Sequence, residues 1–267
     1  MMKNFDGRVF PWNADGLTGL EVSPESDKAG RLVVLLHGYG GDALSNMTFA
    51  CAIAESAPGA AVCVIDGTAP VPNENNPQKR QWWNLDDDAF DGAWCSFMPD
   101  LAPKNARDTM RRAAVEANET AGKINRFVIN RLDRDGLTPR DCVLIGISQG
   151  GMTAFECVLF RPELTRAGDA LGGLVSIGSG ILRPDRLRER TTPFPPVPVL
   201  LARGEFDEIF PKTVDLFSRS LLTELGTTAG IVERPSGHYG LEHAVCGDVC
   251  AFIGDPRSFL QKKSNLT

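Results

Sequence analysis

The sequence contains no hydrophobic run long enough to cross a lipid bilayer. Its longest apolar stretches, Leu32–Leu36 and Val197–Ala202, fall far short of the roughly 20 residues that a membrane-spanning helix needs. The first residues, Met-Met-Lys-Asn-Phe-Asp-Gly-Arg, also lack the apolar segment of a secretory signal. We therefore expect a cytoplasmic protein without a transmembrane segment.

Positive charge is scarce as well. The chain has 28 Lys and Arg residues against 34 Asp and Glu, a formal net charge of −6 at pH 7. The basic residues are dispersed and form no stripe, whereas phosphate binding needs concentrated positive charge. We therefore expect no nucleic-acid partner.

Cysteine is present without the density of a disulfide scaffold, with an odd total of seven. Cys63 and Cys142 stand in apolar surroundings, as small buried residues of a reducing compartment do. Cys246 and Cys250 would share one face of a helix. Two neighbouring thiols are favoured over a disulfide or a metal pair there, because no His or Cys partner stands at ligand spacing.

Short apolar runs alternate with amphipathic stretches, which is typical of an α/β fold with a mostly parallel sheet covered on both faces. The 267 residues, 42% of them hydrophobic, suit one large domain. The predicted strands are Leu32–His37, Ala61–Asp66, Asp141–Ile147, Gly173–Ile177, Val197–Ala202 and Ala229–Glu233. The predicted helices span about 44–56, 103–132, 150–161, 212–225 and 240–254.

Residues 67–102 do not follow this alternation. They are rich in Pro, Asn and Asp and hold three of the four tryptophans. A long irregular segment in a compact domain is usually functional or disordered, and the aromatic content argues against disorder. We interpret it as a cap or a pocket-lining insertion.

The most informative motif is Gly146-x-Ser148-x-Gly150, which follows the apolar run Cys142–Ile147 and precedes a helix-like stretch. This order is what a nucleophile elbow requires, because a sharp strand-to-helix turn exposes the serine hydroxyl above the sheet. The two glycines let strand and helix approach closely. We therefore predict a nucleophilic serine at Ser148.

Further polar residues follow other predicted strands. A glycine-rich turn at 37–41 can present a backbone N–H to an oxyanion, and it lacks the Walker and dinucleotide-binding spacings. Asp207 follows a late strand, although Glu205 and Glu208 are alternatives there. Among only three histidines, His238 is favoured over His243 as the base. The order Ser148, Asp207, His238 is that of an α/β-hydrolase triad.

These segments resemble the phospholipase/carboxylesterase family of α/β-hydrolases, which includes acyl-protein thioesterases. The matching pieces are Leu-Leu-His-Gly-Tyr-Gly-Gly-Asp at 35–42, Gln-Trp at 81–82, Gly-Ile-Ser-Gln-Gly-Gly at 146–151, Gly-x-x-Asp-x-x-x-Pro at 204–211 and Gly-His at 237–238. The resemblance implies a single α/β-hydrolase domain over residues 1–267. It also implies Asp207 as the third triad member and the N–H groups of Tyr39 and Gln149 as the oxyanion hole. Arg203 departs from the family, which usually has His there.

The expected activity is serine-dependent hydrolysis of a small-molecule or lipid-like carboxylic ester or thioester, without metal or organic cofactor. A serine acyltransferase or peptidase and a non-catalytic ligand-binding homologue are the alternatives. The sequence leaves the oligomeric state open, with a homodimer as one alternative. Aromatic residues of the insertion are predicted either to contact the acyl group or only to pack, and they are Trp82, Trp83, Trp94 and Phe97.

Overall fold

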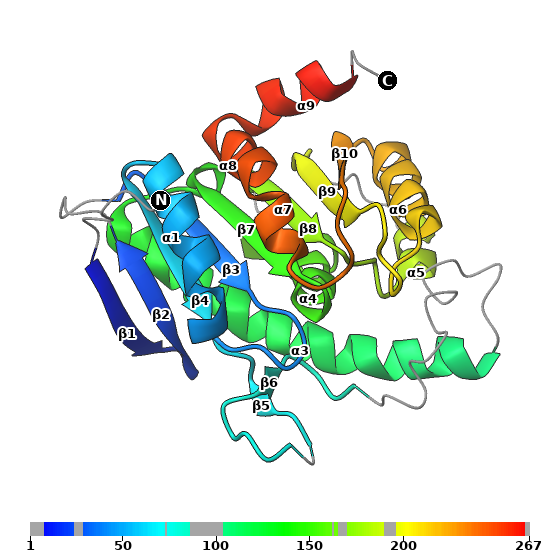
Figure 1. Ribbon diagram of the computed structural model, residues 1–267, viewed down its shortest axis with the longest axis horizontal. Coiled ribbons are helices and arrows are strands. Elements are labelled where there is room, and N and C mark those ends of the chain that lie inside the picture. The colour runs from blue at the N-terminus through cyan, green and yellow to red at the C-terminus, as the bar shows by residue number, and fades with distance from the viewer. Residues whose placement is uncertain are drawn as a thin grey trace.

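The computed structural model describes residues 8–23, 29–72, 74–85, 104–161, 163–164, 170–189 and 196–264. An eight-stranded sheet runs through the molecule in the order β1-β2-β4-β3-β7-β8-β9-β10 (Figure 1). Its strands are β1 (Arg8–Ala14), β2 (Leu17–Ser23), β3 (Arg31–Leu36), β4 (Ala60–Ile65), β7 (Cys142–Ile147), β8 (Gly173–Ile177), β9 (Val199–Gly204) and β10 (Ala229–Arg234). A separate small hairpin consists of β5 (Ala69–Pro70) and β6 (Arg80–Gln81).

Helices connect the strands and cover the sheet. They are η1 (Leu44–Asn46), α1 (Met47–Ser56), α3 (Lys104–Asp135), η3 (Pro139–Asp141), α4 (Gln149–Leu159), α5 (Pro184–Arg188), α6 (Lys212–Glu224), α7 (Leu241–Ala244), α8 (Cys246–Gly254) and α9 (Pro256–Ser264). Within the described ranges, none of these helices has the length and apolar composition needed to cross a membrane.

The six strands predicted from the sequence form the parallel part of the sheet, from β4 to β10. The predicted fold class, an α/β-hydrolase fold with a mostly parallel sheet, is confirmed. The antiparallel strands β1 and β2 at one edge were not predicted. The helix predicted at 240–254 is two helices, because the chain turns at Val245 between α7 and α8.

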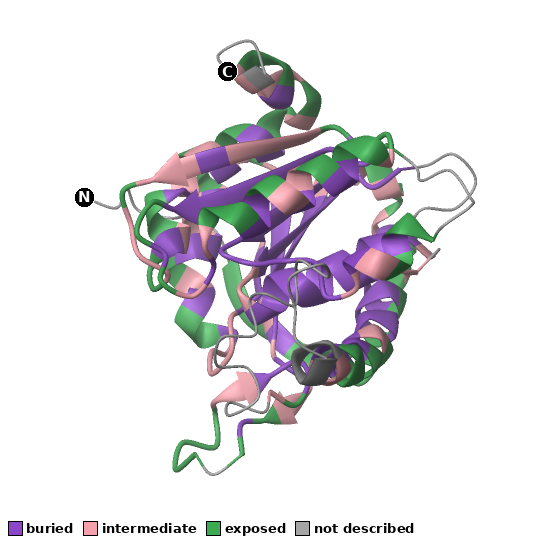
Figure 2. Cartoon of the chain, turned by 90° about the vertical axis from the view of Figure 1, so that its right-hand side faces the viewer, coloured by how far each residue is buried: buried purple, intermediate pink, exposed green. Residues whose placement is uncertain are grey.

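The core lies on both faces of the sheet because successive residues of a strand point to opposite sides. Val34 and Leu144 pack with α3, α4 and α6 on one face. Val33 and Leu35 pack with α1, α8 and α9 on the other. Figure 2 shows buried strands between helices whose outer sides are exposed. This covering explains why the parallel strands are continuously apolar in sequence.

The parallel register brings the carboxyl ends of the strands to one edge of the sheet. Leu36 of β3 is opposite Gly146 of β7, and Ile147 of β7 is opposite Ile177 of β8. The segments that follow β3, β7 and β9 therefore meet at this edge, where open α/β sheets carry their sites.

Cys246 and Cys250 lie in successive turns of α8, with their Sγ atoms 3.9 Å apart. They are two neighbouring thiols and not a disulfide. Cys250 also donates to the Ala52 carbonyl, so this pair contacts α1.

Candidate active site

Ser148 stands at the junction of β7 and α4 with a positive φ of 50° and a ψ of −117°. L-residues rarely adopt this conformation, and it is the strain expected of a nucleophile elbow. The turn is held by the Ser148 N–H, which donates to the Ile177 carbonyl at 2.8 Å, and by Ser179 Oγ, which donates to the Ser148 carbonyl at 2.8 Å. A Cβ at Gly150 would lie 2.4 Å from the Leu36 carbonyl oxygen, so only glycine fits there.

The structure brings Ser148, His238 and Asp207 together from three different loops. His238 Nε2 lies 3.1 Å from Ser148 Oγ, and His238 Nδ1 lies 2.9 Å from Asp207 Oδ2. The Asp207 side chain is fully buried, whereas Glu205 and Glu208 are exposed. This chain of contacts has the order nucleophile, base and orienting acid.

His243, the alternative base, is exposed on α7. Its Nε2 lies 3.5 Å from Glu242 Oε1. No described contact joins it to Ser148, so the geometry favours His238.

Two backbone N–H groups anchor the carboxylate of Asp207. Its Oδ1 accepts hydrogen bonds from the N–H groups of Ile209 and Phe210, at 2.9 and 2.8 Å. Burial raises the pKa of this carboxyl, but the hydrogen bonds from His238 and from the backbone outweigh burial and hold the pKa below its ordinary value of 3.8. Asp207 is therefore ionised at neutral pH and can keep a proton on Nδ1 of the imidazole.

The glycine-rich turn after β3 lies beside the serine, since a Cβ at Gly38 would be 3.6 Å from Ser148 Cβ. Two backbone hydrogen bonds tie this turn to β6, one from the Gly40 N–H to the Arg80 carbonyl and one from the Arg80 N–H to the Gly41 carbonyl. Tyr39 belongs to this fixed turn. The other predicted oxyanion donor, Gln149, is the first residue of α4, where backbone N–H groups have no partner within the helix.

The buried side chain of His37 holds the same turn through hydrogen bonds. Its Nδ1 lies 2.7 Å from the Gly38 carbonyl, and its Nε2 accepts a hydrogen bond from the Gly67 N–H at 2.8 Å. The proton therefore resides on Nδ1. Burial lowers the pKa of His37, so the imidazole is neutral and serves as loop support.

Trp82 and Trp83 are buried in the core and do not line the pocket beside Ser148. Their burial favours the alternative that these two only pack, and it speaks against the predicted contact with the acyl group. Gln149 holds this segment, since its Oε1 accepts from the Trp82 N–H and its Nε2 donates to the Trp83 carbonyl. Trp94 and Phe97 lie outside the described residues.

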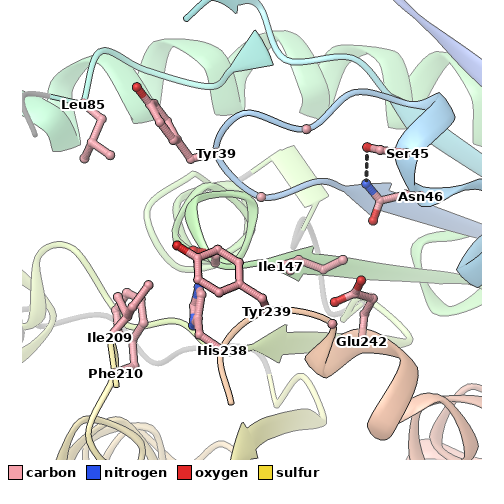
Figure 3. Close-up of a pocket in the computed structure, with 14 residues that line it drawn as sticks. Tyr39, Ser45, Asn46, Leu85, Ile147, Ile209, Phe210, His238, Tyr239 and Glu242 are labelled. Atoms are coloured by element: carbon pink, nitrogen blue, oxygen red, sulfur yellow. Dashed lines mark hydrogen bonds between the residues drawn. The ribbon is translucent and has the colours of Figure 1, made fainter. Parts of the chain in front are cut away.

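A cavity of about 480 Å³ opens at Ser148 (Figure 3). Sequence reasoning missed most of its walls, although Ile209 and Phe210 follow Asp207 by two and three residues and Glu242 follows His238 by four. The cavity is lined by Gly38, Tyr39, Gly41, Ser45, Asn46, Leu85, Ile147, Ser148, Ile209, Phe210, His238, Tyr239, Gly240 and Glu242.

The sheet order and the strand-to-helix turn at Ser148 define an α/β-hydrolase fold. The chain belongs to the phospholipase/carboxylesterase family, whose model matches residues 17–262. The predicted family is thus confirmed, and the protein is a hydrolase of ester bonds.

Solved structures of similar fold include the following three proteins. The esterase PE8 is 24% identical, with 89% of this chain and 98% of PE8 covered at a TM-score of 0.68. SOBER1 from Arabidopsis thaliana is 18% identical, with 84% and 97% covered at a TM-score of 0.63. A carboxylesterase from Mesorhizobium loti is 16% identical, with 93% and 99% covered at a TM-score of 0.61.

Proposed function

We propose that this protein is a serine hydrolase that cleaves carboxylic esters or thioesters through an acyl-enzyme on Ser148. The observation that carries the proposal is the pair of contacts at His238, 3.1 Å to Ser148 Oγ and 2.9 Å to Asp207 Oδ2. Both distances suit proton transfer through an oriented imidazole.

In the first half-reaction, Ser148 Oγ attacks the carbonyl carbon of the substrate while His238 Nε2 takes the hydroxyl proton. The tetrahedral intermediate then collapses, and His238 gives this proton to the leaving alcohol or thiol. In the second half-reaction, water attacks the acyl-enzyme with His238 again as base, which releases the acid and restores Ser148. Asp207 stabilises the imidazolium that forms in each half-reaction.

The oxyanion of each tetrahedral intermediate is stabilised by the N–H groups of Tyr39 and Gln149. The hydrogen bonds that tie the glycine-rich turn to Arg80 support this role, because donors fixed in advance cost no reorganisation. Losing one such donor commonly costs roughly 3–4 kcal/mol of transition-state stabilisation.

Hydrolysis of p-nitrophenyl esters of graded acyl length tests the proposal. We expect turnover by the wild type and a loss of more than about 10³-fold in kcat/KM for Ser148→Ala. Ser220→Ala, at an exposed serine of α6, is the matched control and should retain wild-type rates. A folded wild type that cleaves none of the esters, or a Ser148→Ala variant with wild-type rates, would overturn the proposal.

A further inference from the structure

The pocket has two chemically different sides, with His238 between them. Leu85, Ile209 and Phe210 are apolar and lie on one side in Figure 3. Ser45, Asn46 and Glu242 are polar and lie on the other, together with the apolar side chain of Ile147. An ester that reacts with Ser148 must place its acyl and alcohol parts in different directions from the carbonyl carbon. The two sides are therefore suited to two unlike ends of one substrate.

Hydrogen bonds within the loop after β3 leave Asn46 Oδ1 as an acceptor on the polar side, because Ser45 Oγ already accepts from the Asp42 N–H and from Asn46 Nδ2. Asn46 Nδ2 donates to the Asp42 carbonyl and to Ser45 Oγ, at 3.3 and 3.2 Å. Ser45 Oγ in turn donates to the Asp42 carbonyl. These bonds use the donors of both side chains, and they orient the Asn46 amide with Oδ1 as its remaining polar atom.

Glu242 adds a negative charge to this side. It lies at the start of α7, and its side chain is only 20% exposed. The nearest described group able to carry positive charge is His243, at 3.5 Å, whose own side chain is 57% exposed. No Lys or Arg is among the described residues that line the pocket.

A carboxylate in a partly buried pocket whose described lining holds no Lys or Arg attracts cations and repels anions. We infer that the polar side, with Glu242 as its determining residue, selects esters that carry a positively charged nitrogen on one side of the scissile bond and a hydrocarbon group on the other. This inference rests on the proposed function. It deepens that function, because it names a substrate class within carboxylic esters.

The substrate preference is measured with pairs of esters that differ only in charge. Butyrylcholine and 3,3-dimethylbutyl butyrate form a pair with the charge on the alcohol. Butyl esters of 4-trimethylammoniobutanoic and 5,5-dimethylhexanoic acid form a pair with the charge on the acyl group. In at least one pair we expect the wild-type kcat/KM ratio of charged to neutral ester to exceed that of Glu242→Gln by about fivefold or more. The pair that responds identifies which part of the substrate faces Glu242.

Glu205→Gln is the matched control, because Glu205 is exposed and does not line the pocket. It should keep the wild-type ratio. The neutral esters report on folding, since Glu242→Gln must still cleave them. If that variant does not fold, the wild-type ratio is measured from low to about 1 M salt, where screening should bring it down severalfold.

The outcomes separate the two claims. Equal ratios in both pairs for the wild type and Glu242→Gln, or a wild-type ratio that salt does not change, would overturn the inference while ester hydrolysis stands. Cleavage of no ester by folded wild type would instead remove the proposed function itself.

Discussion

Asp207 shows at the residue scale how the fold prepares a side chain for catalysis. One carboxylate oxygen faces His238, and the other is anchored by the N–H groups of Ile209 and Phe210. The backbone bonds fix the carboxylate before any substrate binds. The pKa of Asp207 stays low despite burial, so the negative charge persists throughout the neutral range. The imidazole of His238 is thereby held with its acceptor nitrogen toward Ser148.

Asp207→Asn should lower kcat by about 10³–10⁴-fold, because an amide that donates to Nδ1 would favour the wrong tautomer of His238. The shape of the side chain is kept, so the unfolding midpoint should change far less than activity does. Steady-state kinetics and thermal unfolding of the same preparation measure both effects. Glu208→Gln, at an exposed acid in the same loop, should be nearly unchanged. A kcat for Asp207→Asn within tenfold of wild type would exclude Asp207 as the orienting acid.

At the element scale, the junction of β7 and α4 sets the position of the serine. A Cβ at Gly150 would lie 2.4 Å from the Leu36 carbonyl oxygen and 2.5 Å from that of His37. These backbone atoms belong to β3 and to the start of the glycine-rich turn. Close approach at Gly150 therefore couples the elbow to the turn that carries Tyr39.

Gly150→Ala should destabilise the protein by about 1–3 kcal/mol, since backbone must shift to admit the methyl group. It should also lower kcat, because the shift separates Ser148 from the turn. Gly247 of α8 is the matched control, as a Cβ there meets nothing within 4 Å. Gly247→Ala should stabilise the protein by about 0.5 kcal/mol through loss of unfolded-state freedom. Urea denaturation of both variants checks the pair, and equal effects would contradict this account of the junction.

The parallel strands were predictable because each is buried on both faces and therefore apolar throughout. The β1 and β2 strands were not recognised, for different physical reasons. β1 is largely exposed and contains Pro11, so its composition is that of a loop. β2 includes Glu21, an acid whose burial depends on a partner far along the chain.

The site was predictable where the local sequence specifies the backbone conformation. The glycines around Ser148 do this, because they permit the sharp strand-to-helix turn. The pocket walls were not, because Leu85 and Glu242 reach the site through tertiary packing and carry no local signal. The sequence also left open whether the tryptophans contact substrate or only pack, for a related reason. A large aromatic residue predicts burial without saying whether protein or ligand covers it, and protein covers Trp82.

At the scale of the whole molecule, a buried ion pair joins the edge of the sheet to the longest helix. Arg131 of α3 donates to both carboxylate oxygens of Glu21 on β2, one of the bonds measuring 2.8 Å. Both side chains are less than a tenth exposed. Burial raises the pKa of Glu21, but the hydrogen bonds from Arg131 and Ser23 outweigh burial and leave the pKa below its ordinary value of 4.5. The pair is therefore charged at neutral pH.

Arg131→Met should cost about 3–5 kcal/mol of unfolding free energy at pH 7, because it leaves the Glu21 carboxylate buried without its partner. The double variant Glu21→Leu with Arg131→Met should recover most of this loss. A folded-state pKa below 4.5 means that the pair stabilises above about pH 4.5 and that this stabilisation is lost as the pH falls through the lowered pKa. The deficit of Arg131→Met should therefore shrink below pH 4.5. Urea denaturation at pH 7 and pH 4 measures the difference in unfolding free energy between the wild type and Arg131→Met. The same difference at both pH values would contradict the pairing.

The central claim is that Ser148 becomes covalently acylated. The most direct measurement is reaction with an alkyl fluorophosphonate, followed by intact-mass and peptide mass spectrometry. We predict one adduct per chain, on Ser148, with ester hydrolysis lost in proportion to labelling and no adduct in Ser148→Ala. Full labelling at another residue, or undiminished turnover after full labelling of Ser148, would contradict the claim.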